Sequence, residues 1–249
     1  MTSPDLAVKL DAVTKSFGGH RVLDGVTLEV PEGCGFVILG RSGTGKSVTL
    51  RHIIGLVQPD AGRVFVHGTD ITDLRGAALA EVRKQLGFLF QSGALFDSIS
   101  VGENVAFPMR RHTKLPDAEI RQRVQAKLDS VGLGSDYDKM PGDLSGGMRK
   151  RAGLARAMAL DPRVLLVDEP SAGLDPITSE EIDELLLGLK QNRQTTLVVV
   201  THNIPSARKL GDRLVMLDQG RIAAQGTVEE LEQSDSELVR AFMSSSHAG

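Results

Sequence analysis

A glycine-rich segment, GRSGTGKS at residues 40–47, limits this chain to a small group of folds. It fits the pattern G-x-x-x-x-G-K-[ST] at every fixed position. The apolar run 34–40 before it is typical of a buried strand, and 47–56 after it has the apolar spacing of a helix. A strand, a glycine-rich turn and a helix in this order predict a loop whose backbone N–H groups surround an anion.

The residue types in the loop predict a nucleotide as that anion. The start of the following helix adds its dipole, which favours a phosphate. Lys46 supplies a fixed positive charge for the β- and γ-phosphates, and Ser47 supplies a hydroxyl for magnesium. We therefore expect a nucleoside triphosphate and Mg²⁺ as ligands. The candidate contacts are the loop residues and the residue after them: Gly40, Arg41, Ser42, Gly43, Thr44, Gly45, Lys46, Ser47 and Val48.

A second candidate site is the acidic end of the apolar run VLLVDEP, residues 164–170. A buried strand here would place Asp168 and Glu169 at its carboxyl end, where open α/β sheets bind ligands. Asp168 can then hold magnesium through water, and Glu169 can polarise the attacking water. Asp-Glu-Pro is also good turn chemistry, so the segment alone leaves a solvated strand end open.

A third segment, LSGGMRKR, lies between the other two. Ser145 is a plausible N-cap, and the helix after it is predicted to run to about Leu160. Gly146 and Gly147 would expose amides that can bind a phosphate. A capped helix with a solvated basic face is the alternative. The predicted apolar face consists of Met148, Ala152, Ala155 and Ala159.

The three segments, in this order, resemble the nucleotide-binding subunit of an ATP-binding cassette (ABC) transporter over nearly the whole chain. The resemblance implies an ATPase in which Glu169 is the catalytic base. It also implies that Phe17 stacks on adenine and that Gln91 touches magnesium and water. Asp175 would lie in a loop that crosses to a partner subunit, and His202 would contact the γ-phosphate.

Alternating strand and helix patterns predict a mainly parallel sheet. With the resemblance, the expected fold class is α/β: a P-loop NTPase (RecA-like) core, an N-terminal antiparallel β subdomain and an inserted α-helical subdomain. We expect one domain over 1–249, with a core of about 1–92 and 158–249, an insert of about 93–157 and a flexible tail at 244–249.

Two helices are expected from spacing alone. Apolar residues recur at helical intervals in 116–133, within the expected insert. The segment 228–242 is predicted to be one moderately amphipathic helix, whose apolar face is either core or a docking surface. The string 91–110 leaves the same two alternatives. Its apolar residues are Ala94, Leu95, Phe96, Ile99 and Val101.

Three local strings narrow the resemblance: LSGGM, DPITS at 175–179 and the segment 87–110. They are similar to the ATPases of MCE-type lipid transporters, the Mla, Mkl and TGD systems. That branch implies phospholipid cargo, a membrane permease and an MCE-domain lipid-binding protein, with room for a small accessory subunit. It also implies a head-to-tail pair in which each chain lends Ser145, Gly146 and Gly147 to the other's ATP. Another cargo, such as an amino acid, a metal or a drug, stays open.

Composition favours a cytoplasmic protein, and the resemblance implies a peripheral position on the inner face of the cell membrane. The net charge is −3 and aromatic residues make up 4%, so nothing indicates a nucleic-acid surface, and a soluble ABC-type factor acting on DNA or ribosomes is the weaker alternative. The single cysteine fits a reducing compartment. Apolar runs are too short for a span, and the start lacks the pattern of a signal peptide.

Overall fold

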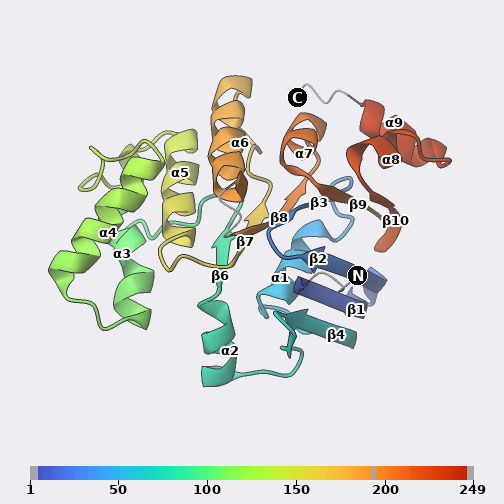
Figure 1. Ribbon diagram of the computed structural model, residues 1–249, viewed down its shortest axis with the longest axis horizontal. Helices are drawn as coiled ribbons and strands as arrows, with labels where there is room; N and C mark the ends of the chain where they lie inside the picture. Colours follow the sequence, from blue (N-terminus) through green and yellow to red (C-terminus); the bar gives the residue numbers. More distant parts are fainter. Residues whose placement is uncertain (1–4, 192–194, 246–249) are drawn as a thin grey trace.

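The computed structural model describes residues 5–191 and 195–245, and its centre is a six-stranded sheet in the order β10-β9-β3-β8-β7-β6 (Figure 1). The strands from β9 to β6 are parallel neighbours, and β10 pairs antiparallel with β9. The strands are β3 (Gly35–Leu39), β6 (Leu86–Leu89), β7 (Val164–Asp168), β8 (Thr196–Thr201), β9 (Arg213–Asp218) and β10 (Arg221–Gly226).

Alternate residues of the central strands enter two different hydrophobic cores. In β3, Val37 and Leu39 pack with α6 (Pro176–Gln191) and α7 (Ile204–Leu210), whereas Phe36 and Ile38 pack with α1 (Lys46–Ile53) and the smaller sheet. Both faces are covered in this way, so β3, β7 and β8 are buried along their whole length. Continuous apolar runs such as VLLV are the sequence of a strand in that setting.

The smaller sheet has four strands in the order β2-β1-β4-β5, with antiparallel pairing throughout. Its strands are β1 (Leu6–Phe17), β2 (His20–Pro31), β4 (Ala61–Val66) and β5 (Thr69–Asp70). This sheet packs on the face of the large sheet that α1 also covers. It is the expected N-terminal antiparallel unit.

Helices α3, α4 and α5 follow one another between β6 and β7 and lie together at one side of the molecule (Figure 1). Their bounds, with the 3₁₀ turn η1, are α3 (Val101–His112), α4 (Asp117–Ser130), η1 (Pro141–Asp143) and α5 (Gly146–Ala157). The remaining helices are α1 (Lys46–Ile53), α2 (Gly76–Arg83), α6 (Pro176–Gln191), α7 (Ile204–Leu210), α8 (Val228–Glu232) and α9 (Glu237–Ser244). The predicted fold class is confirmed.

The carboxyl-terminal segment corrects the sequence analysis. Residues 228–242, predicted as one helix, form α8 and the start of α9 with a break at Gln233–Ser236. Ser side chains can bind nearby backbone groups and so compete with helix formation, as Ser234 does in the break by accepting from the Ser236 N–H. Ser244, expected in the tail, ends α9, and residues 246–249 lie outside the described residues.

Candidate nucleotide site

The glycine-rich loop joins the carboxyl end of β3 to α1, and its fixed glycines are sterically required. A Cβ at Gly40 would lie 2.4 Å from the Leu217 carbonyl oxygen. Gly45 has φ 103°, and a Cβ there would lie 2.6 Å from a Leu23 methyl group. The loop is therefore pressed against the strand layer, and its backbone turns without side chains in the way.

Lys46 is the first residue of α1 and is buried beneath this loop. Its Nζ donates to the carbonyl oxygens of Gly40 at 2.8 Å and Arg41 at 3.1 Å. The same Nζ lies 3.3 Å from Glu169 Oε1. The side chain therefore holds a compact positive charge between the loop and the acidic end of β7.

The acidic end of β7 completes the charged part of the site. Asp168 Oδ1 accepts from Ser47 Oγ at 2.7 Å. Burial raises the pKa of Asp168, and the bond from Ser47 opposes that shift. Glu169 Oε2 lies 2.9 Å from His202 Nδ1 at the end of β8. The structure thus brings together predicted residues from three segments that are far apart in sequence.

The oxygen atoms at this edge fit a magnesium ion. Hydroxyl, carboxylate and amide oxygens are hard ligands, and Ser47, Asp168 and Gln91 can supply them. Among the described residues no group of three or more His, Cys, Asp or Glu side chains could hold a metal ion. Mg²⁺ keeps few protein ligands and commonly takes the rest from phosphates and water, so this donor set is sufficient.

A cavity of about 630 Å³ opens over the loop, a volume usual for a small-molecule site. Ten predicted residues line it: Arg41, Ser42, Gly43, Gly45, Lys46, Ser47, Val48, Gln91, Glu169 and His202. The sequence analysis missed five others: Val22, Leu238, Ala241, Phe242 and Ser245. Four of these belong to α9 or follow it directly. The only sequence signal for them was the amphipathic pattern of the last segment.

The other predicted residues do not line this cavity. Phe17 is half exposed at the end of β1, with Lys15 Nζ 5.4 Å from its ring centroid. Asp175 caps α6, accepting from the backbone N–H groups of Ile177 at 3.1 Å and Thr178 at 3.0 Å. Gly40 and Thr44 stay within the loop, where Thr44 Oγ1 donates to the Arg41 carbonyl at 3.0 Å.

The glycine pair at the start of α5 also lies outside the cavity. Ser145 is the N-cap of α5 and accepts from the Met148 N–H at 3.2 Å, which confirms the predicted cap. Gly146 and Gly147 adjoin Leu174 and Thr178, beside Asp175. The two segments that the resemblance assigns to a partner's nucleotide are therefore neighbours.

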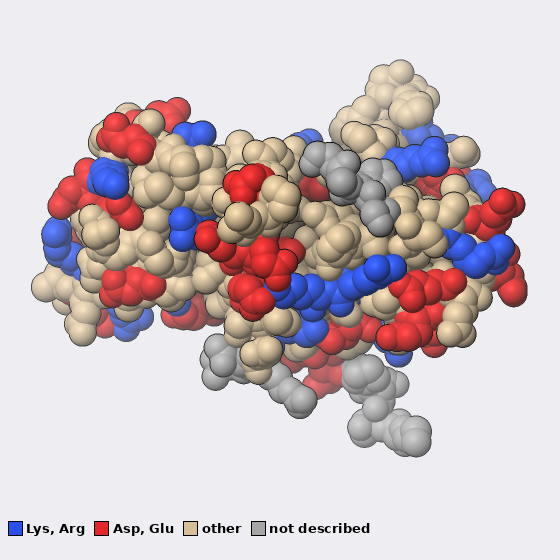
Figure 2. Space-filling view, turned by 90° about the horizontal axis from the view of Figure 1, so that it is seen from above, with Lys and Arg blue, Asp and Glu red and all other residues tan. Residues whose placement is uncertain are grey.

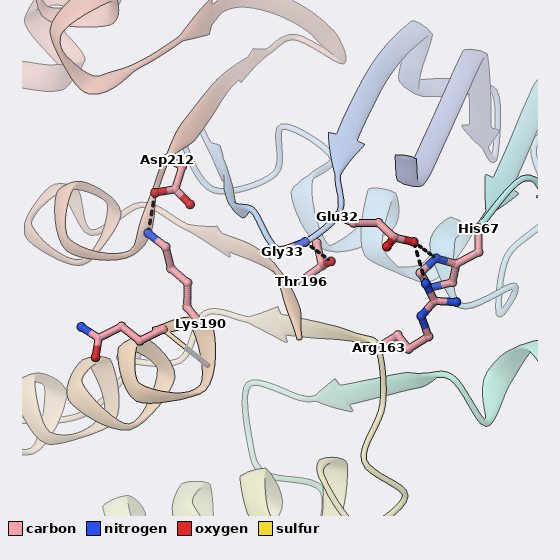
Figure 3. A pocket seen from close by; sticks show the side chains of 8 residues that line it. Glu32, Gly33, His67, Arg163, Lys190, Thr196 and Asp212 are labelled. Atoms are coloured by element: carbon pink, nitrogen blue, oxygen red, sulfur yellow. Dashed lines mark hydrogen bonds and ion pairs between the residues drawn. The ribbon is translucent and has the colours of Figure 1, made fainter. Parts of the chain in front are cut away.

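A second cavity, of about 640 Å³, lies at the opposite ends of the strands (Figure 3). Its charged side chains are bonded to one another. Arg163 donates to Glu32 at 2.8 Å, and His67 Nδ1 lies 2.8 Å from the same carboxylate. Lys190 donates to Asp212 at 2.7 Å. Among the described residues that line this cavity there is no glycine-rich loop like the one at the carboxyl ends.

The chain belongs to the ABC transporter family, whose model matches residues 23–172. Together with its relatives this makes it the ATP-binding subunit of such a transporter, and an ATPase. A similar solved structure is the ATP-binding cassette MJ0796, a dimer in a post-hydrolysis state with ADP and Pi. The two chains are 34% identical with a TM-score of 0.83, over 88% of this chain and 98% of that one.

The names of three similar curated proteins state three different cargoes. The "Probable ribonucleotide transport ATP-binding protein mkl" of Mycobacterium leprae is 45% identical over 98% of this chain and 70% of its own length. The intermembrane phospholipid transport protein MlaF of Haemophilus influenzae is 41% identical over 95% and 89%. The methionine import protein MetN of Caulobacter vibrioides is 42% identical over 88% and 66%.

Proposed function

We propose that this chain hydrolyses Mg²⁺-ATP to drive phospholipid transport with an MCE-type system. The observation that supports the chemistry is the meeting of Lys46, Ser47, Asp168, Glu169 and His202 at one edge of the sheet. The similarity to MlaF over most of both chains supports the cargo. The strings LSGGM and DPITS point to the same branch.

Each residue at that edge has a task in this proposal. Lys46 binds the β- and γ-phosphates, while Ser47, Gln91 and, through water, Asp168 hold magnesium. The ion supplies positive charge against the phosphates. Glu169 accepts a proton from the attacking water, and His202 orients its carboxylate and reaches the γ-phosphate. Phe17 stacks on adenine outside the part of the cavity that the loop residues line.

We propose a head-to-tail dimer as the active form. Ser145, Gly146 and Gly147 start a helix but do not line the cavity of their own chain. A second copy could place the same amides, and Asp175 beside them, over that cavity. MJ0796 is a dimer in its solved structures.

The proposed partners include a membrane permease and an MCE-domain protein, with room for a small accessory subunit. None of the helices in residues 5–191 and 195–245 is long and apolar enough to cross a membrane. The chain would then be cytoplasmic and peripheral on the inner membrane face.

In the string 91–110, Val101 is fully buried core, whereas Phe96 is half exposed beside Phe107, with 5.0 Å between ring centroids.

The exposed pair Phe96 and Phe107 is the proposed docking surface for a permease helix, a helix-in-groove contact. Phe96→Asp should reduce recovery of the permease in a detergent pull-down by about tenfold, since a charge would be desolvated in the contact. Circular dichroism and nucleotide affinity of the free subunit should stay unchanged. Leu56→Asp, at another exposed apolar position, is the matched control. Unfolding of the Phe96 variant alone would instead make Phe96 a core residue.

Copurification tests the cargo assignment. The tagged chain should bring down a permease, an MCE-domain protein and phospholipid from solubilised membranes. Recovery of a methionine-binding or other solute-binding protein would contradict it and favour another cargo. Recovery of nucleic acid would favour the soluble-factor alternative. Acidic and basic side chains are interspersed over the face seen in Figure 2, which gives no basic surface there for nucleic acid.

A further inference from the structure

Two loop residues beside the site have a positive backbone φ angle, which residues other than glycine rarely adopt. Glu169 has φ 46° and Ala94 has φ 48°. Residues with a Cβ rarely adopt this left-handed conformation, and they keep it only where the surrounding structure fixes it. Glu169 follows β7, and Ala94 lies three residues after Gln91, so both strained positions border the proposed chemistry.

Helix α5 contacts both strained loops through cations. Lys150 is only 5% exposed, and its Nζ donates to the carbonyl oxygens of Pro170 at 2.7 Å and Ala172 at 2.6 Å. The Glu169 carbonyl oxygen lies 3.4 Å from the same nitrogen. An ammonium group has three donors, and three carbonyl groups surround this one.

A second cation on α5 holds the other loop in the same way. Arg156 donates to the carbonyl oxygens of Ala94 at 2.7 Å and Gly93 at 3.0 Å. A Cβ at Gly153 would lie 3.0 Å from Gly93 Cα, so helix and loop are in close contact. The pattern indicates that α5 organises the active-site loops of its own chain.

We propose that Lys150 is a positioning residue for ATP hydrolysis: its ammonium holds the backbone from Glu169 to Ala172 and so aims the Glu169 carboxylate. This rests on the proposed role of Glu169 as the base. Burial lowers the pKa of Lys150 to about 8, mainly by desolvation, with the Glu169 charge opposing the shift. The cost of burying this charge is offset by its carbonyl contacts rather than by a carboxylate partner.

The position of Lys150 also links two sites. It lies one helical turn and a half from Ser145, at the start of the same helix. In the proposed dimer that start contacts the partner's nucleotide. Closure on the partner's ATP would therefore act through α5 on the base of the chain's own site.

Substitution of Lys150 should separate catalysis from binding. Lys150→Met keeps an unbranched side chain of nearly the same length and removes every donor. It should lower kcat by about tenfold or more, because small misplacements of a catalytic group are costly. KM for Mg²⁺-ATP should change less than about twofold. Lys150→Gln keeps N–H donors and should recover part of kcat. The control is Lys127→Met, which removes a lysine that pairs with Asp161 on the surface.

A double substitution tests whether Lys150 acts through Glu169. With Glu169→Gln in place, Lys150→Met should add less than about a twofold loss, because coupled positions are not additive. The same tenfold loss in both backgrounds would overturn the proposal, as would unchanged kcat in Lys150→Met. Loss of the fold in both Lys150→Met and Lys150→Gln, seen by circular dichroism, would also overturn it. Normal hydrolysis by Glu169→Gln alone would instead remove the proposed base.

Discussion

The two edges of the six-stranded sheet carry cavities of nearly equal volume, about 630 and 640 Å³, but very different chemistry. At the amino edge each cation faces a carboxylate, as Lys190 faces Asp212 and Arg163 faces Glu32. At the carboxyl edge two acidic residues, Asp168 and Glu169, converge on a glycine-rich loop and one buried lysine. Volume therefore does not identify the site, and the arrangement of charges does.

Strand direction explains the difference. At the carboxyl edge the loop after β3 opens α1, so free backbone N–H groups and the helix dipole face the cavity. At the amino edge the helices end, and their last carbonyl groups attract cations such as Lys190, which donates to the Leu210 carbonyl at 3.1 Å. The carboxyl edge can therefore bind an anion, whereas at the amino edge the charged side chains pair with groups of the chain itself.

The largest effect is expected from Lys46→Ala at the carboxyl edge. The variant removes the fixed cation that the phosphates need, and ATP binding should weaken by about 10²-fold or more. Fluorescent-nucleotide titration measures this, with circular dichroism as the control for folding. Near-normal affinity would rule out the assignment of the phosphate loop.

Glu169→Gln should spare binding and slow hydrolysis by about 10²-fold or more, because an amide cannot accept the proton. An ATP-bound dimer should then accumulate. Size-exclusion chromatography with and without ATP, alongside a phosphate-release assay, measures both effects. A variant that elutes like the unmodified chain and still hydrolyses ATP would contradict the role of Glu169.

The sequence predicts the carboxyl edge well, because phosphate chemistry restricts which residues can stand there. Gly40 and Gly45 must be glycine for steric reasons that a motif records. Lys150 was not singled out, because a lysine beside two arginines indicates a solvated basic face. The structure buries Lys150 and leaves Arg149 exposed. Only the path of the loop after Glu169 determines that Lys150 is buried and Arg149 is not.

Other elements were missed for a similar reason. Helix α2 and strand β6 are short, and their apolar residues carry no strong period. The α9 wall of the nucleotide cavity joins Leu238 to a loop almost two hundred residues earlier, a contact that tertiary packing alone creates. Helix α4, within 116–133, was predicted because four turns repeat a single apolar face.

Met148 tests a finer distinction at the carboxyl edge, because it follows the glycine pair but does not line the cavity. It is partly buried against the core, and its backbone N–H binds the Ser145 cap. A thioether is a weak acceptor and offers no donor to phosphate. Met148→Gln should therefore keep ATPase activity within about threefold. A loss beyond about tenfold would mean that Met148 shapes the loop that the partner's nucleotide contacts.

The smallest effect is expected at the amino edge. Glu32 is exposed and binds Arg163 and His67, so Glu32→Gln removes surface charge pairing that typically contributes about 0–1 kcal/mol. The amide keeps one oxygen to accept, and the midpoint of urea unfolding should shift only slightly. ATP affinity and kcat should match the unmodified chain, since the sheet separates this cavity from the phosphate loop. A severalfold fall in kcat at unchanged stability would show that the two edges are coupled. It would contradict the assignment of the chemistry to the carboxyl edge alone.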